Sequence, residues 1–222
     1  MRSHNWKKRL LSEIEKGRVI GDDIIDISHI LNHLINARLM KDIMQDCVLP
    51  YLENLDPRPD IIFTPEASGI TLAAVLSTLT EIDMIFAKKG KPITMTLASV
   101  LSEKISSATK GGEVNLFTRK DFLERYTNFF VIDDFLRTGV TLKGVIEMGV
   151  TAGLELSGVS IFGLKSFDPG LKYISEKYNV EVHSVLDFDK ITSNGSKSFL
   201  HIRKLCFKPV DITLELNRYE LM

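Results

Sequence analysis

The chain has 222 residues, of which 44% are hydrophobic and 26% charged, a balance typical of a globular protein with a core. Its net charge of −1 argues against a nucleic-acid partner, and no apolar run approaches the roughly 18 residues needed to span a membrane. The basic segment 1–9 has no apolar stretch behind it, so it is not a secretory signal and we expect a cytoplasmic protein. Cys47 and Cys206 are too few and too far apart to indicate a disulfide framework or a zinc site, and we interpret both as reduced thiols.

The hydrophobic pattern predicts one domain with an appendage, in which a helical beginning is followed by alternating strands and helices. Residues 1–58 have apolar residues at helical spacing, interrupted by a segment of mixed character at 21–33. Residues 59–204 alternate between the two periods, which predicts an α/β fold with a mostly parallel central sheet flanked by helices. We expect strands at 61–64, 84–87, 129–132, 159–164 and 182–186, and helices at 69–79, 142–152 and 171–178. No role is assigned to the tail, 205–222.

The strongest functional signal lies at 130–141, where an apolar strand leads into two carboxylates, a polar turn and a helix. The backbone N–H groups of such a turn meet at the positive end of the helix dipole, which suits a phosphate. Carboxylates only accept hydrogen bonds, so a pair of them suits vicinal hydroxyls. The segment therefore predicts a ribose 5-phosphate site, although an acidic turn exposed to solvent is the alternative for the carboxylates alone. The candidate residues are Asp133, Asp134, Arg137, Thr138, Gly139, Val140 and Thr141.

These residues resemble the signature of the type I phosphoribosyltransferases for 5-phosphoribosyl-1-pyrophosphate (PRPP), and they match neither a Walker loop nor a dinucleotide fingerprint. The segments 25–33 and 166–170 extend the resemblance to bacterial xanthine phosphoribosyltransferases, over roughly residues 17–190. The resemblance implies the type I fold, with a small hood from the N-terminal segment and a flexible loop. It also implies a homodimer that binds PRPP and a purine base, with Mg²⁺ carried by PRPP and not by direct protein ligands.

A second strand-to-helix turn, 64–69, is a candidate anion site because it ends in small residues at a helix start. In the family the matching turn holds the pyrophosphate of PRPP. Lys88 and Lys89 follow the next strand and could neutralise that pyrophosphate, although one of them is expected to be a solvated surface lysine. The candidate residues of the turn are Ala67, Ser68 and Gly69.

Lys165 lies at the carboxyl end of the strand 159–164 and is the candidate reader of the base. An ammonium group only donates, so it favours the 6-oxo group of a purine over the amino group of adenine. The alternative is a lysine that ends a strand in solvent. The resemblance assigns this reading role to a lysine and implies base contacts for Ile25 and Asn32, although Ile25 takes a place usually held by Leu.

The segment 99–120 is rich in Ser, Gly and Lys and has little apolar periodicity, which predicts a long loop. Such a loop is either functional or plain solvated surface. The resemblance implies a mobile hood loop that closes over PRPP, with Ser102 and Lys104 as candidate contacts. The Ser-Tyr pair common in relatives is replaced by Leu101 and Ser102.

We therefore predict a purine phosphoribosyltransferase that acts on a 6-oxopurine (xanthine, guanine or hypoxanthine) and releases pyrophosphate. A non-catalytic PRPP-binding regulator is one alternative, but the residues before Gly17 are too few for the DNA-binding domain of the related repressors. An enzyme for adenine or orotate is another. No general base is assigned, because Arg137 stands where some relatives have Asp.

Overall fold

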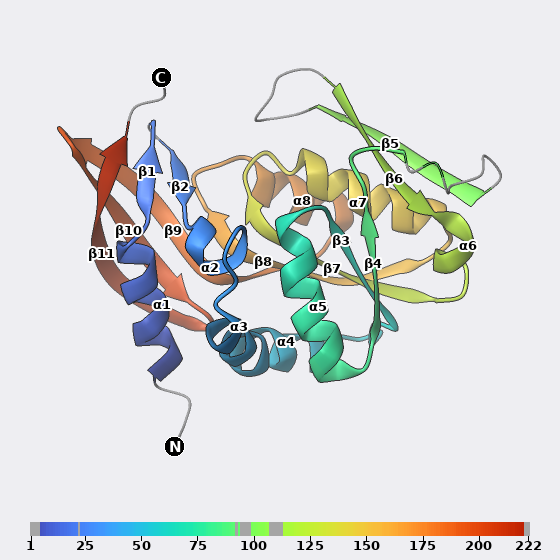
Figure 1. Cartoon of the computed structure of the whole chain (residues 1–222). Coiled ribbons are helices and arrows are strands. Elements are labelled where there is room, and N and C mark those ends of the chain that lie inside the picture. Colours follow the sequence, from blue (N-terminus) through green and yellow to red (C-terminus); the bar gives the residue numbers. More distant parts are fainter. Residues whose placement is uncertain (1–4, 22, 92, 94–98, 107–112, 220–222) are drawn as a thin grey trace.

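The computed structural model describes residues 5–21, 23–91, 93, 99–106 and 113–219. Most strands belong to one nine-stranded sheet of order β2-β1-β11-β10-β9-β8-β7-β3-β4 (Figure 1). Neighbours from β9 to β4 are parallel, whereas β10 pairs antiparallel with β9 and with β11. The predicted mostly parallel sheet is therefore confirmed. The strands are β1 Arg18–Ile20, β2 Ile24–Asp26, β3 Ile61–Pro65, β4 Asp83–Ala87, β7 Asn128–Leu136, β8 Glu155–Lys165, β9 Val182–Asn194, β10 Lys197–Leu205 and β11 Lys208–Tyr219.

Two hydrophobic cores cover the two faces of the sheet, because successive side chains of a strand point to opposite faces. Phe130 and Ile132 of β7 pack in the core that contains the N-terminal helices and α5, while Phe129 and Val131 pack with α7 and α8 in the other. All four side chains are buried, which explains the continuous apolar run of this strand. The helices are α1 Asn5–Glu15, α2 Ser28–Leu31, α3 Ala37–Ile43, the π-helical turn η1 Met44–Val48, α4 Leu49–Glu53, α5 Ser68–Thr80, α6 Lys120–Leu123, α7 Val140–Thr151 and α8 Gly170–Tyr178.

The N-terminal region is less helical than its sequence pattern indicates. The segment of mixed character contains the short strands β1 and β2, which form an antiparallel pair. Strand β1 also pairs in parallel with β11, so the first and the last strand of the described chain are neighbours in the sheet. The C-terminal residues up to Tyr219 are thus a strand of the main sheet, and they support the strand pair that carries Ile25.

The prediction of a long loop at 99–120 is wrong for the described residues of that segment. Strands β5, Val100–Ser106, and β6, Glu113–Arg119, form an antiparallel two-stranded ribbon beside α7 (Figure 1). Ile105 and Leu116 are buried, and a Cβ added at Gly144 of α7 would lie 2.8 Å from one and 3.1 Å from the other. The ribbon thus has a small apolar face that packs against a glycine. These few apolar residues are too sparse to predict a strand pair in a segment of mostly polar composition.

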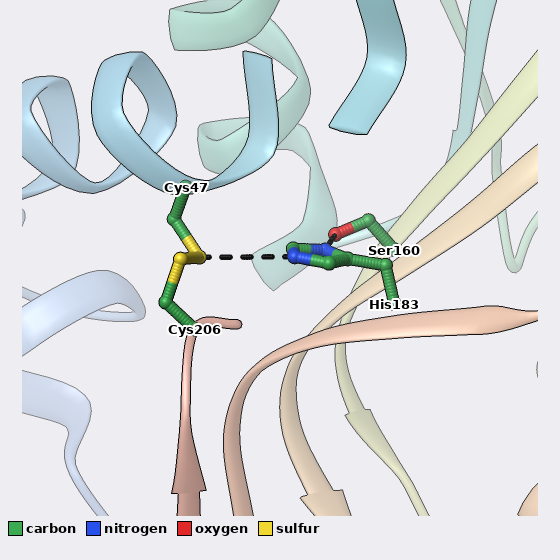
Figure 2. The surroundings of a disulfide bond; sticks show 4 residues. All are labelled: Cys47, Ser160, His183 and Cys206. Atoms are coloured by element: carbon green, nitrogen blue, oxygen red, sulfur yellow. Dashed lines mark hydrogen bonds between the residues drawn. A yellow bond between two sulfur atoms is a disulfide. The ribbon is translucent and has the colours of Figure 1, made fainter. Parts of the chain in front are cut away.

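The interpretation of both cysteines as reduced thiols is also wrong for this structure, which pairs Cys47 with Cys206 in a disulfide (Figure 2). Their Cα atoms lie 5.7 Å apart, within the span that a disulfide bridges. The two residues are 159 positions apart in sequence. Their proximity arises only because η1 packs over the turn between β10 and β11, so sequence spacing could not reveal it.

Across the residues that the structure describes, no helix combines the length and the apolar character that crossing a membrane requires.

Candidate active site

A cleft of about 710 Å³ lies at the carboxyl ends of β3, β7 and β8, a size that suits a small-molecule ligand. Strand order explains its position, because parallel strands end at the same edge of the sheet and helix-forming turns follow them. Most of the residues predicted from the sequence meet here. Those that line the cleft are Ile25, Asn32, Ala67, Ser68, Lys89, Asp133, Asp134, Arg137, Thr138, Gly139, Val140, Thr141 and Lys165.

The two carboxylates lie within β7 and not after it, since this strand continues to Leu136. Pairing with β3 ends at Val131, whereas pairing with β8 continues, so one edge of β7 opens onto the cleft beside Asp133 and Asp134. The carboxylate of Asp133 accepts a hydrogen bond from the backbone N–H of Asp134 (2.8 Å). Burial, and next the charge of Asp134, raise the pKa of Asp133 well above its ordinary value. Two charged carboxylates are therefore unfavourable here, and a cation or a hydrogen-bond donor beside them would lower that cost.

The loop 137–141 turns from β7 into α7, and all of its residues line the cleft. Gly139 has φ +80°, a conformation that L side chains rarely adopt, and its backbone begins the helix. The backbone N–H of Gly170 donates to the carbonyl oxygen of Arg137 (2.9 Å), which ties the loop to the start of α8. The loop therefore lies at the N-terminus of α7, where the sequence predicts an anion-binding turn, and its role in binding stays a prediction.

Lys165 ends β8 and is 5% exposed, so it is not a lysine that extends into solvent. Its ammonium group donates to the carbonyl oxygen of Asp23 and lies 3.6 Å from the carboxylate of the same residue. Arg137 also pairs with the Asp23 carboxylate, at 2.6 Å. Burial lowers the pKa of Lys165, and Asp23 opposes that shift.

Asp23 is a residue that sequence reasoning did not find. Its carboxylate links the N-terminal strand pair to Arg137 of the loop 137–141 and to Lys165, the candidate base reader. In the sequence only its position beside β2 marks it. An ammonium group has three donors, so the contacts with Asp23 leave donor capacity for a carbonyl oxygen in the cleft.

The second turn places Ala67 and Ser68 in the cleft at the start of α5. Gly69 does not line the cleft but lies directly beneath it, because a Cβ there would contact the Thr64 hydroxyl and lie 3.1 Å from an Asp133 carboxylate oxygen. Its missing side chain lets α5 approach β7. The backbone N–H of Lys89 donates to the Glu66 carboxylate, which brings that lysine to the same turn.

Besides Gly69, three predicted residues are not among those that line the cleft. The Lys88 ammonium lies 5.6 Å from the ring centroid of Phe86, and Lys104 pairs with Glu113 across the ribbon. Ser102 lies opposite Phe117 in the same ribbon. The ribbon contributes apolar side chains to the cleft instead, Ile105 and Val114.

Comparisons with known proteins identify the family and the fold. No protein-family model matches the chain. The chain is 34% identical over 194 residues to a xanthine phosphoribosyltransferase of Streptococcus pyogenes, an alignment that covers 87% of this chain and 96% of the relative. Solved structures share the fold: an adenine phosphoribosyltransferase from Thermoanaerobacter pseudethanolicus has a TM-score of 0.65 at 21% identity, covering 81% of this chain and 99% of that one. Another, from Leishmania tarentolae, has a TM-score of 0.66 at 15% identity, covering 84% and 89%.

The identity to the streptococcal enzyme spans most of both chains, and the fold match agrees with it. The chain therefore belongs to the type I phosphoribosyltransferases, in their purine branch, and is an enzyme of the pentosyltransferase class.

Proposed function

We propose that the protein transfers the ribose 5-phosphate of PRPP to a 6-oxopurine and releases pyrophosphate. One observation carries the choice of base: the buried Lys165 ammonium lies in the same cleft as Ile25 and Asn32. A buried donor without an acceptor partner costs free energy, so this ammonium favours a carbonyl oxygen and disfavours an amino group. Asn32 both donates and accepts, which suits the mixed edge of a purine.

The PRPP end of the cleft would bind in three parts. The backbone N–H groups of the loop 137–141 and the hydroxyls of Thr138 and Thr141 suit the 5-phosphate. Asp133 and Asp134 suit the ribose hydroxyls, whose hydrogen bonds would stabilise both carboxylates. Ala67, Ser68 and Lys89 lie where a pyrophosphate would extend, and Lys89 would offset its charge.

The chemistry then depends on position and charge. Bond breaking at the ribose C1 precedes bond making, so positive charge develops on the ribose beside the two carboxylates. The loop 137–141 and the 67–68 turn would hold both phosphate ends, which fixes the ribose for attack by a purine nitrogen. Asp23 is a positioning residue in this scheme, because it holds the Lys165 ammonium against the base site.

The residues of the cleft fit Mg²⁺ bound together with PRPP. Magnesium prefers oxygen ligands and commonly binds with substrate phosphates, and Asp133 and Asp134 line the same cleft as the two candidate phosphate-binding turns. Bound there, the cation would neutralise charge on the departing pyrophosphate. The expectation that PRPP carries the metal, and that the enzyme is a homodimer, stays a prediction.

A panel of bases tests the proposal directly. The full chain is incubated with PRPP, Mg²⁺ and xanthine, guanine, hypoxanthine, adenine or orotate, and pyrophosphate release is measured. We expect turnover with the 6-oxopurines, with xanthine first because the streptococcal relative is named for it, and little with adenine. Adenine as the best substrate would contradict the role of Lys165. PRPP binding with no turnover on any base would favour the regulator.

A further inference from the structure

The disulfide lies in a second cluster of reactive side chains that does not line the active-site cleft. Cys47 comes from η1, Cys206 from the turn between β10 and β11, and His183 from β9 (Figure 2). One potential ligand atom of each lies within 4.8 Å of the others, and all three residues are buried. Within the described part of the chain this is the one group of at least three His, Cys, Asp or Glu residues with such proximity.

The imidazole of His183 is oriented toward the sulfurs. Its Nε2 lies 3.7 Å from the Cys47 Sγ, and its Nδ1 shares a 2.8 Å hydrogen bond with the Ser160 hydroxyl (Figure 2). Tyr51 stacks on the ring, with centroids 4.7 Å apart, and Phe207 packs 5.1 Å away. In metal sites a second hydrogen bond of this kind orients the ligating nitrogen, so Ser160 and the two rings provide the support that a histidine ligand needs.

We propose that Cys47, Cys206 and His183, once the disulfide is reduced, bind a soft closed-shell cation, Zn²⁺ or Cu⁺. Two thiolates and one imidazole are the donors that such cations prefer. Zinc bonds of about 2.3 Å to sulfur and about 2.0 Å to nitrogen, at a tetrahedral angle, place the two atoms about 3.5 Å apart. The observed 3.7 Å between the Cys47 sulfur and the His183 nitrogen is close to this value. Once the disulfide is reduced, the two sulfurs would separate to about 3.8 Å to bind the same cation.

The chemistry of loading balances in two steps. A phosphine reductant takes one oxygen atom from water and converts the disulfide into two thiols. Metal binding then releases the two thiol protons, leaving two thiolates on the cation. With Zn²⁺ the buried site is electrically neutral, which avoids the cost of an unpaired buried charge. With Cu⁺ the site carries one negative charge, but three ligands complete its coordination, whereas zinc takes a fourth.

The disulfide and the metal-bound form would join the same two parts of the fold. The disulfide closes a loop of 159 residues between the N-terminal helices and the β10–β11 turn, and a metal held by the same residues would preserve that link under reducing conditions. Cys47 and Cys206 would therefore connect the two parts of the fold in both states, by a disulfide under oxidising conditions and by a bound metal under reducing conditions.

Metal analysis of the full chain tests the site. Oxidised and phosphine-reduced protein are each incubated without oxygen with Zn²⁺ or with Cu⁺, desalted, and analysed for metal by mass spectrometry. Intact mass distinguishes disulfide from thiols, and circular dichroism verifies folding. We expect one equivalent of metal in the reduced chain and none in the oxidised chain, and the cation retained against a chelator identifies Zn²⁺ or Cu⁺. No metal above the oxidised level for either cation overturns the proposal.

Variants separate the ligands from other histidines. Cys206→Ser and His183→Gln should each lower metal affinity at least tenfold and raise the melting temperature less when metal is added. His201→Gln is the matched control, because His201 is partly exposed and lies between the carboxylates of Asp189 (2.6 Å) and Asp211 (2.8 Å). Unchanged affinity in His183→Gln removes the histidine from the site. Should a variant fail to fold, the comparison of oxidised and reduced wild-type chains still decides.

Discussion

Replacing Lys165 by Met is the sharpest test of how the base is read. Methionine keeps most of the volume of the side chain but removes the ammonium group. Hydrogen bonds to charged groups contribute about 1.5–3 kcal/mol, so loss of the contact with a 6-oxo group should lower kcat/KM for the base about 10- to 150-fold. The Asp23 carboxylate keeps its pairing with Arg137, so the substitution leaves no unpaired buried charge.

Stability should change little in the same variant, and this separates a reading role from a structural one. The Asp23 carbonyl oxygen loses a donor, which costs about 1 kcal/mol. Removal of a buried ammonium group, whose pKa burial lowers, offsets that cost. We therefore expect an unchanged melting temperature without ligand.

Steady-state kinetics measure the effect, with base varied at saturating PRPP and PRPP varied at saturating base. The KM for the base should rise while the KM for PRPP stays near that of the wild type. Lys172→Met is the control, since its side chain is 80% exposed on α8 and pairs only with the neighbouring Glu176 among described contacts. Unchanged kinetics for the base, or a defect confined to PRPP, would refute the reasoning about Lys165.

Four further outcomes are expected. Asp133→Asn and Asp134→Asn should reduce turnover and PRPP affinity without lowering the melting temperature, because burial already disfavours the charged form of Asp133. Loss of folding would mean that the two carboxylates stabilise the strand. Gly139→Ala should lower activity and destabilise by more than the backbone strain of about 1–2 kcal/mol, because its Cβ would lie 3.2 Å from both Ile174 and Tyr173. Gly153→Ala has a similar φ but nothing within 4 Å of the added Cβ, so it should cost only that strain and leave turnover intact. Although burial opposes the shift, hydrogen bonds from Ser28 and Arg18 lower the pKa of Asp26 to about 2. Asp26→Asn should therefore lower the free energy of unfolding by about 1 kcal/mol after solvent screening. Melting experiments should show this difference above pH 3.8 and its loss as the pH falls toward 2. Hydrogen exchange in the β5–β6 ribbon should slow when PRPP and Mg²⁺ are added, and equal exchange with and without ligand would identify the ribbon as plain surface.

Local sequence patterns were enough to predict the core of the fold and most of the residues that line the cleft. The apolar run of β7, its two carboxylates and the turn at Gly139 are neighbours in sequence, so strand, turn and helix could be predicted together. Parallel strands end at one edge, and this rule alone brought Lys165 and the turn at 67–68 to the same place. The exact strand ends were less predictable, because pairing with β8 extends β7 past Asp134.

Contacts between distant segments were decided only by the tertiary structure. Asp23 meets Lys165 across 142 residues, and Cys47 meets Cys206 across 159. No hydrophobic period or spacing encodes such pairs, because they depend on how separately formed elements pack. The β5–β6 ribbon follows the same rule, since its strands gain their buried face only from α7. Sequence thus determined which chemistry gathers at the carboxyl edge of the sheet, and packing determined which partners orient it.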